Sequence, residues 1–425
     1  MQINRRFFLH KGALALAGTT AIPQFLVRAV IAQSGMAQSA LAPNRRLVVI
    51  FQRGAADGLN IVVPYREKNY YSMRPSIAIP QKQVVDLDGF FGLHPSLAAF
   101  KSLYDQGHLA IVHAAGSPDM TRSHFDAQDF MESGTPGVKS TDDGWLNRAL
   151  QAEDLRHRQE HSAFRALALG AEVPRTLAGK IPAIAISNVN NFTVGARGPA
   201  PSPAANAFEA MYGASGDHIF HAAGEETFDA VKMLRAANPA QYKSAADYPT
   251  SDFGNNMKQI AQLLKANLGV EAAFTDVSGW DTHQNQGGVD GQLSNRLRDF
   301  SSAIAAFWKD MGDEAANITL VTMSEFGRTA HENGTGGTDH GHANAMFVLG
   351  PDVKGGKVYG RWPGLANEQL NEGRDLALTT DYRAVLGEVV SKTLGADNLE
   401  RVFPGTRMRS DGFLRLMSGG NGSAA

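Results

Sequence analysis

The segment Arg45-Arg46-Leu47-Val48-Val49-Ile50-Phe51, followed by Gly54-Ala55-Ala56-Asp57-Gly58, carries the clearest structural signal in the chain. A short, uninterrupted apolar run that ends in a glycine-rich turn is typical of a strand buried on both faces. Such strands lie inside parallel sheets that are covered by helices. We therefore expect residues 47–51 to form a central strand of an α/β domain.

The same alternation of strands and helices recurs along the rest of the sequence. Apolar residues at helical spacing predict helices, and short apolar runs predict the strands between them. Pro95 suits the start of the first helix, and Thr379 or Thr380 is expected to cap the last one. The pattern predicts an α/β fold, a three-layer αβα sandwich around a mostly parallel sheet. The predicted strands span 109–113, 271–276, 318–323 and 345–349, and the predicted helices span 95–106, 257–268, 293–311 and 381–394.

The N-terminal segment reads as an export signal and is set apart from the fold. Arg5-Arg6, followed by Phe8 and Leu9, matches a twin-arginine leader, and the mildly apolar run at 13–22 is shorter than the roughly 20 residues that span a bilayer. We assign 1–42 to a signal peptide with its linker and predict a periplasmic or secreted protein. A basic amphipathic N-terminus of a cytosolic protein is the alternative.

The remainder is predicted to be one domain at 43–417, with a helical cap inserted at about 197–255 and a flexible tail at 418–425. Lys and Arg total 40 and Asp and Glu total 42, so the formal net charge of −2 argues against a nucleic-acid partner. Cysteine is absent, which excludes disulfides and thiolate metal sites. No later segment is predicted to span a membrane.

Acidic and imidazole side chains recur where the predicted strands end. Ligands of open α/β sheets bind beyond the carboxyl ends of the strands. Unpaired like charges about 4 Å apart would repel by about 4 kcal/mol at an effective dielectric of 20, and a divalent cation reverses that sign. Oxygen and nitrogen donors without sulfur favour Zn²⁺, Mn²⁺ or Fe²⁺, and one ion is favoured over two. The candidate metal ligands are Asp57, Asp281, His283, Glu325 and His340.

Several of these residues also have structural interpretations. Asp57 could be a turn former, and Glu325 could form an ion pair with Arg328 instead of binding a metal. Arg122 and Arg328 could bind an anionic substrate or act as counter-ions. Asp281 and His283 are two residues apart, so an extended backbone directs both to one side.

Five motifs together resemble the bacterial domain-of-unknown-function family 1501. The likeness runs from about Arg45 to Phe403, and it implies an alkaline phosphatase-like and sulfatase-like fold with one or two metals at the carboxyl edge. It also implies phosphoryl or sulfuryl transfer through a Ser, Thr or formylglycine nucleophile. Met120 and Phe326 depart from the superfamily pattern, because Met120 stands at the nucleophile position and Phe326 at that of a metal-binding histidine. The motifs are Arg53 to Asn60, Ser123 to Asp126, Gly279 to His283, Ser324 to Thr329 and Thr338 to Asn344.

The sequence therefore predicts an exported, metal-dependent hydrolase of phosphate or sulfate esters, acting on a small anionic ester. The alternative is a non-catalytic exported binding or assembly protein with a degenerate metal site and a protein partner, which the resemblance implies. The candidate catalytic residues are Thr121, Arg122, Ser123, His124 and Arg328.

Overall fold

The computed structural model describes residues 45–157, 162–189, 233–234, 241–406 and 412–418. The predicted signal segment, most of the predicted cap and nearly all of the predicted tail lie outside these residues. Within them, no helix has the length and apolar character needed to cross a bilayer.

The apolar run at the start of the domain forms the middle of the main sheet. Strand β1 (Arg46–Arg53) pairs in parallel with β8 (Ala272–Ser278) on one side and with β9 (Ile318–Ser324) on the other. Every residue of β1 except Arg53 is buried. A strand with neighbours on both edges and helices on both faces has no solvent-facing side, which explains its unbroken apolar sequence.

The main sheet has nine strands in the described residues, and one of them runs against the others. The order is β11-β5-β10-β9-β1-β8-β6-β7, with β12 beside β5, and only β10 is antiparallel to its neighbours. The remaining bounds are β5 (Leu109–Gly116), β6 (Ala166–Leu169), β7 (Ile184–Ile186), β10 (Asn344–Leu349), β11 (Lys357–Tyr359) and β12 (Thr380–Asp381), and a small second sheet holds β2 (Val62–Val63), β4 (Gly92–Leu93) and β3 (Val85–Asp86).

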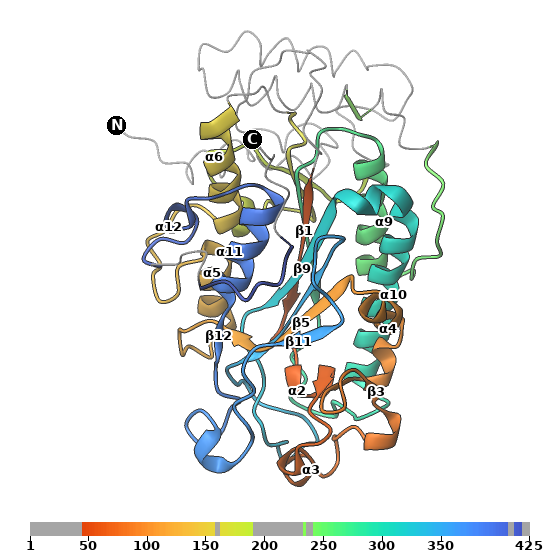
Figure 1. Ribbon diagram of the computed structural model, residues 1–425, viewed down its shortest axis with the longest axis vertical. Helices are drawn as coiled ribbons and strands as arrows, with labels where there is room; N and C mark the ends of the chain where they lie inside the picture. Colours follow the sequence, from red (N-terminus) through yellow and green to blue (C-terminus); the bar gives the residue numbers. More distant parts are fainter. Residues whose placement is uncertain (1–44, 158–161, 190–232, 235–240, 407–411, 419–425) are drawn as a thin grey trace, which may run out of the picture.

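Helices cover both faces of the main sheet, so the predicted three-layer α/β architecture is confirmed (Figure 1). Val48 and Ile50 of β1 pack in one core with α4, α9 and α10, whereas Leu47 and Val49 pack in the other with α6 and α11. This alternation is the period-2 pattern of a strand. The helices are α2 (Gly58–Ile61), α3 (Lys68–Met73), α4 (Ala99–Asp105), α5 (His124–Ser133), α6 (Trp145–His157), α9 (Asp252–Lys265), α10 (Gln292–Met311), α11 (Tyr382–Thr393) and α12 (Leu399–Val402).

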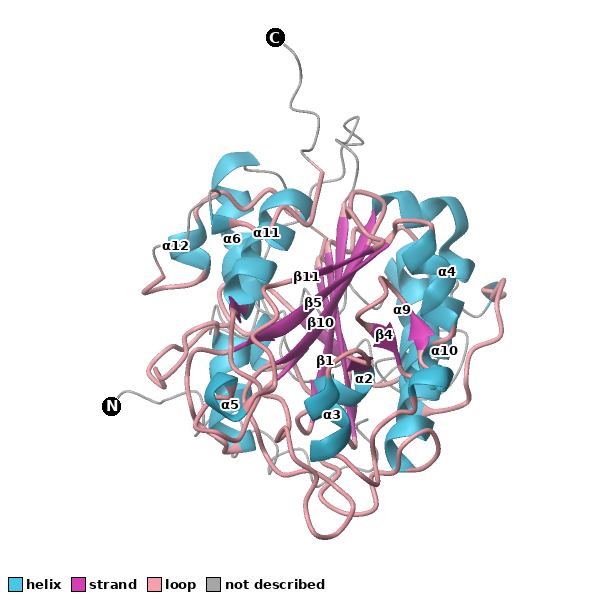
Figure 2. Cartoon of the chain, turned by 60° about the horizontal axis from the view of Figure 1, so that its bottom comes forward, coloured by secondary structure: helices cyan, strands magenta, loops and turns pink. Residues whose placement is uncertain are grey.

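The reversed direction of β10 determines which loops meet. Because β10 runs opposite to β9 and β5, the loop that precedes it lies at the same edge as the loops that follow those two strands. Figure 2 turns this carboxyl edge toward the viewer, with α2 and α3 in front of the strand ends. One edge of the sheet therefore gathers the loops after β1, β5, β8 and β9 together with the loop before β10.

One prediction about local structure needs correction. The last long helix is capped by Asp381, whose side chain accepts from the Arg383 N–H, and not by Thr379 or Thr380. Most of the predicted cap at about 197–255 lies outside the described residues, so the cap stays a prediction. In the described part, Tyr242 and Tyr248 donate to Asp310 near the end of α10, just before β9 begins, and α9 starts at Asp252.

Candidate metal centre

Four loops place one side chain or two at the carboxyl edge of the sheet. His124 is the first residue of α5, and Asp281 and His283 lie in the loop after β8. Glu325 follows β9 directly, and His340 precedes β10. The last two loops are joined by a bridge between Arg328 and His340. Gly341 allows this approach, because a Cβ there would lie 2.3 Å from the Arg328 carbonyl oxygen.

The Nε2 atom of His340 is the meeting point of the group. It lies 3.0 Å from Nε2 of His124, 2.9 Å from Nε2 of His283 and 3.3 Å from Oδ1 of Asp281. His283 Nε2 is also 3.0 Å from Asp281 Oδ1, and His124 Nε2 is 3.4 Å from Asp281 Oδ2. His124, Asp281 and His340 each offer a ligand atom within 4.8 Å of the others. We call these four residues, His124, Asp281, His283 and His340, the metal group.

Each histidine of the metal group directs its other nitrogen to an oxygen outside the group. His124 Nδ1 lies 2.8 Å from Glu325 Oε1, His283 Nδ1 lies 2.9 Å from Asp339 Oδ1, and His340 Nδ1 lies 2.8 Å from the carbonyl oxygen of Arg122. A carbonyl oxygen or an ionised carboxylate only accepts hydrogen bonds, so Nδ1 is the donor in each contact. When the three imidazoles are neutral, Nε2 of His124 and Nε2 of His283 therefore present lone pairs toward Nε2 of His340. Outward hydrogen bonds of this kind are the usual second layer of histidine metal sites.

The donor set fits a divalent cation. Facing lone pairs of neutral imidazoles repel unless a positive charge lies between them. Two nitrogen ligands of one tetrahedral zinc ion, each about 2.0–2.1 Å from it, lie about 3.3 Å apart, and the contacts in the metal group run from 2.9 to 3.4 Å. All four side chains are partly exposed to solvent, which leaves access for a ligand. The structure thus supports a candidate metal site.

The electrostatics of this region depend on burial and on close partners. Burial opposes ionisation of Asp281 and Glu325, but their partners together outweigh it and lower both pKa values. Arg328 is the main partner of Asp281, and His124 and Gln128 are the main partners of Glu325. The hydrogen bond that His124 donates to Glu325 raises the pKa of His124, whereas burial lowers the pKa of His340. The carboxylates stay ionised and His340 favours its neutral form, as metal ligands require.

Glu325 lies behind the metal group and does not join it. Its carboxylate is fully buried, and Oε1 accepts from the Gly54 N–H, from Gln128 Nε2 and from His124 Nδ1, each at 2.8 Å. In these contacts Glu325 orients His124, and the structure does not bring the expected ligand Glu325 into the metal group. The expected ion pair between Glu325 and Arg328 is also replaced, because Arg328 binds Asp281.

Asp57 does not belong to the metal group. Its carboxylate is 1% exposed, and Oδ2 accepts from Arg74 Nη1 at 2.6 Å and from Gln286 Nε2 at 2.7 Å. The position after β1 is therefore occupied by a buried ion pair, and the assignment of Asp57 as a metal ligand does not agree with these contacts. Asp57 directly precedes α2, but its side chain accepts no hydrogen bond from a backbone N–H of that helix.

The two candidate arginines both bind carboxylates. Arg328 is buried, and its Nη1 donates to Asp281 Oδ1 at 2.6 Å. Arg122 Nη2 lies 2.6 Å from carboxylate oxygens of both Glu372 and Asp375. Both guanidinium groups thus act as counter-ions in this structure, which is the second of the two interpretations of their sequence positions.

The candidate nucleophiles organise the start of α5. Ser123 is the N-cap, and its Oγ accepts from the Asp126 N–H at 3.4 Å. Thr121 Oγ1 accepts from the Ser123 N–H at 3.2 Å. In both contacts the hydroxyl acts as acceptor, so its own proton is not used there.

Phe326 forms an apolar wall of the candidate site. It is buried, and its ring centroid lies 4.9 Å from that of His124 and 5.1 Å from that of His340. The phenylalanine that departs from the superfamily pattern therefore supports two donor rings and supplies no ligand atom itself.

Sequence reasoning did not place His124 among the ligands or Asp339 behind His283. Adjacent side chains in an extended backbone point in opposite directions, so the pair Asp339-His340 can present a ligand on one side and a partner for another ligand on the other. The signal was thus present in the sequence, but the identity of the partner, His283, depends on the loop conformation.

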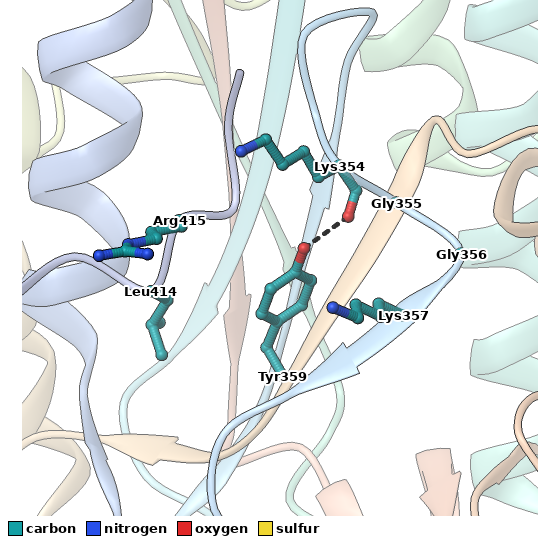
Figure 3. Close-up of a pocket in the computed structure, with 7 residues that line it drawn as sticks. All are labelled: Lys354, Gly355, Gly356, Lys357, Tyr359, Leu414 and Arg415. Carbon is teal, nitrogen blue, oxygen red and sulfur yellow. Dashed lines mark hydrogen bonds between the residues drawn. The ribbon is translucent and has the colours of Figure 1, made fainter. Parts of the chain in front are cut away.

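A separate surface pocket of about 580 Å³ lies near the start of β5, at the other end of the sheet. Lys354, Lys357 and Arg415 line it with Tyr359, whose hydroxyl donates to the Lys354 carbonyl oxygen. Figure 3 shows the Arg415 guanidinium directed away from Tyr359, so the three cations do not converge on one point.

Comparison with known families identifies the chain. The family described as "Protein of unknown function (DUF1501)" matches residues 93–402, which include all four residues of the metal group. The chain belongs to the DUF1501 family. No curated protein sequence matches it.

Solved structures that resemble this DUF1501 protein do so at low similarity. The C-terminal periplasmic domain of EptC from Escherichia coli in complex with Zn shares 13% identity over 72% of each chain, with a TM-score of 0.33. The lipoteichoic acid synthase LtaP from Listeria monocytogenes shares 9% over 75% of this chain and 68% of its own, with a TM-score of 0.34. A putative sulfatase from Bacteroides thetaiotaomicron shares 8% over 74% and 66%, with a TM-score of 0.32. The fold assignment rests on the strand order described above.

Proposed function

We propose that this DUF1501 protein is an exported, metal-dependent hydrolase of phosphate or sulfate esters. The observation that supports the proposal most strongly is the convergence of three imidazole Nε2 atoms and one carboxylate at a partly exposed edge of the sheet. Export is proposed from the twin-arginine pattern at Arg5-Arg6.

His124, Asp281, His283 and His340 would hold a single divalent ion, with Zn²⁺, Mn²⁺ or Fe²⁺ favoured by the nitrogen-rich donor set. When bound, such an ion polarises the oxygen of an ester as a Lewis acid. The chain itself keeps the ligands in the required tautomer through Glu325, Asp339 and the Arg122 carbonyl. Phe326 supports the rings from behind and excludes water there.

Thr121 and Ser123 remain the proposed nucleophiles, since each keeps a hydroxyl proton outside its local contact. Arg122 and Arg328 are proposed to act through the residues they bind, because the guanidinium of each contacts carboxylates. A small anionic ester is the proposed substrate.

Metal analysis and hydrolysis assays test the proposal together. Purified protein, loaded with Zn²⁺, Mn²⁺ or Fe²⁺, is assayed on generic phosphate and sulfate monoesters and diesters, beside Asp281→Asn and His340→Ala. We expect one ion per chain and a loss of hydrolysis of at least a hundredfold in both variants, since Asp281→Asn replaces an anionic ligand by a weaker neutral one and His340→Ala removes a ligand. Hydrolysis at the wild-type rate in both variants would refute a metal-dependent reaction.

A non-catalytic binding or assembly role is the second candidate. It is favoured by Phe326 at the position of an expected ligand and by the pairing of both candidate arginines with carboxylates. Stoichiometric metal without turnover of any ester, together with capture of an exported protein partner, would support this role over hydrolysis.

A further inference from the structure

We propose that a buried series of hydrogen bonds from Asp57 through Gln286 and Thr338 to Arg328 fixes the Asp281 carboxylate in the metal group. Gln286 and Thr338 are then positioning residues. The inference rests on the proposed metal site and deepens it, because it assigns a task to residues that bind no ligand themselves.

Asp281 is the most exposed member of the metal group, so something else must hold its carboxylate in place. Its side chain is 42% exposed, and Arg328 Nη1 donates to its Oδ1 at 2.6 Å. The Arg328 side chain is fully buried and is itself held by Thr338, whose Oγ1 accepts from Nε at 3.1 Å and whose carbonyl oxygen accepts from Nη2. The position of Asp281 therefore depends on Thr338.

The hydrogen bonds beyond Thr338 all point in one direction. Because Thr338 Oγ1 accepts from Arg328, its own proton is donated to Gln286 Oε1 at 2.9 Å. Thr282 Oγ1 donates to the same oxygen at 2.7 Å. The amide orientation of Gln286 is then determined, and its Nε2 donates to Asp57 Oδ2 at 2.7 Å.

Because these side chains are buried, each of their polar groups depends on its partner within the protein. Asp57, Thr282, Gln286, Arg328 and Thr338 are each at most 2% exposed, so water cannot replace a lost partner. Arg74 Nη1, also fully buried, holds the other end by donating to Asp57 Oδ2 at 2.6 Å. Among the atoms of this series, Asp57 Oδ1 is the one without a hydrogen-bond partner in the described residues. The other members are satisfied, and satisfied buried networks hold a single geometry.

The arrangement also bears on two sequence-based predictions, Asp57 as a metal ligand and Arg328 as a catalytic residue. Both lie at the carboxyl edge, in the loops that follow β1 and β9. Asp57 acts on the metal group only through other residues, whereas Arg328 contacts Asp281 directly. Asp57 is the acceptor in which the series ends, and Arg328 is the group that contacts Asp281.

The test is Co²⁺ binding by the full chain, followed by titration and by the visible absorption spectrum of the bound ion. Thr338→Val removes the hydroxyl at nearly constant volume. We expect Co²⁺ to bind about tenfold more weakly, which is the lower end of the loss in metal affinity caused by mutating a residue that supports a ligand. The absorption spectrum of the bound ion should also change. Thr338→Ser restores the hydroxyl and should recover both. The matched control is Thr393→Val, whose buried hydroxyl bonds Thr319 at the far end of the sheet and should leave binding unchanged.

A double-mutant cycle separates positioning from general stability. In an Asp281→Asn background the effect of Thr338→Val on Co²⁺ affinity should shrink to within twofold, because the group being positioned has been altered, whereas a merely structural effect persists. If Thr338→Val does not fold, Gln286→Met takes its place, with weaker Co²⁺ binding expected. Wild-type affinity and spectrum in the folded variant would overturn this inference alone, whereas a wild-type chain that binds no Co²⁺ would overturn the proposed metal site as well.

Discussion

Replacing Glu325 by Gln tests whether the charge of the residue behind His124 strengthens metal binding by the metal group. The amide has nearly the same shape, so its oxygen can keep the hydrogen bonds from Gly54, Gln128 and His124 that Oε1 now accepts. The new NH₂ group would take the place of Oε2, which lies 3.1 Å from Ser324 Oγ. The substitution therefore removes the charge while it preserves the packing.

The expected loss of metal affinity follows from these contacts. Loss of an outer-layer partner of a histidine ligand lowers metal affinity by about 10–100-fold, which corresponds to about 1.4–2.7 kcal/mol. Glu325→Gln keeps the hydrogen bond and loses only the charge, so we expect a value near tenfold. Glu325→Ala also leaves the His124 ring without its acceptor and should approach a hundredfold.

The assay is competition for Zn²⁺ between the metal-free protein and a chromophoric chelator. Glu332→Gln is the matched control, because Glu332 also accepts two backbone N–H bonds, from Ser76 and Ile77, but contacts no residue of the metal group in the described structure. Zinc affinity within threefold of the wild type in Glu325→Ala would refute the role assigned to Glu325.

Three further predictions concern stability. Lys265 and other donors hold the pKa of the buried Asp310 at about 2 against burial, so Asp310→Asn should cost about 2 kcal/mol at pH 7. This cost should be constant above about pH 4 and vanish as the pH falls toward 2, as checked by urea unfolding across that range. Burial raises the pKa of Glu388, whose Oε2 has no partner in the described structure, so ionisation destabilises the fold as the pH rises above the ordinary value of 4.5. Glu388→Gln, which can keep the bond from the Met417 N–H, should be more stable than the wild type by about 1–2 kcal/mol at pH 7 and no more stable at pH 4 in thermal unfolding. Phe300→Ala should cost about 3–5 kcal/mol in chemical unfolding, because this ring of α10 is fully buried and packs against Phe100 of α4 and Phe253 of α9, and a loss below 1 kcal/mol would contradict that packing.

The central architecture was predictable because its signals are local. The apolar run of β1, the amphipathic helix α10 and the strand β9 were each expected within a few residues of their observed bounds. Helix α5 was not predicted, since its sequence from His124 to Ser133 mixes polar and apolar residues and buries only one side against the core. For the same reason, the sequence did not indicate that His124 is the first residue of a helix.

The membership of the candidate site was predictable only in part. Asp281, His283 and His340 were expected as ligands from their position at strand ends, and the structure brings all three together. Asp57 and Glu325 share that position, yet each binds other partners because Arg74 and His124 lie within reach of their carboxylates. Those partners come from distant segments, so no local pattern could indicate which carboxylates remain available.

The reversed strand β10 has a consequence for how the protein is made. His124 and His340 are 216 residues apart in the chain, and His340 reaches its place only when β10 has inserted between β5 and β9. At a synthesis rate of 5–20 residues per second, a ribosome needs roughly 10–40 s to travel that distance. A nascent chain therefore carries an incomplete set of ligands for most of its production, and cation capture is an event of the finished polypeptide.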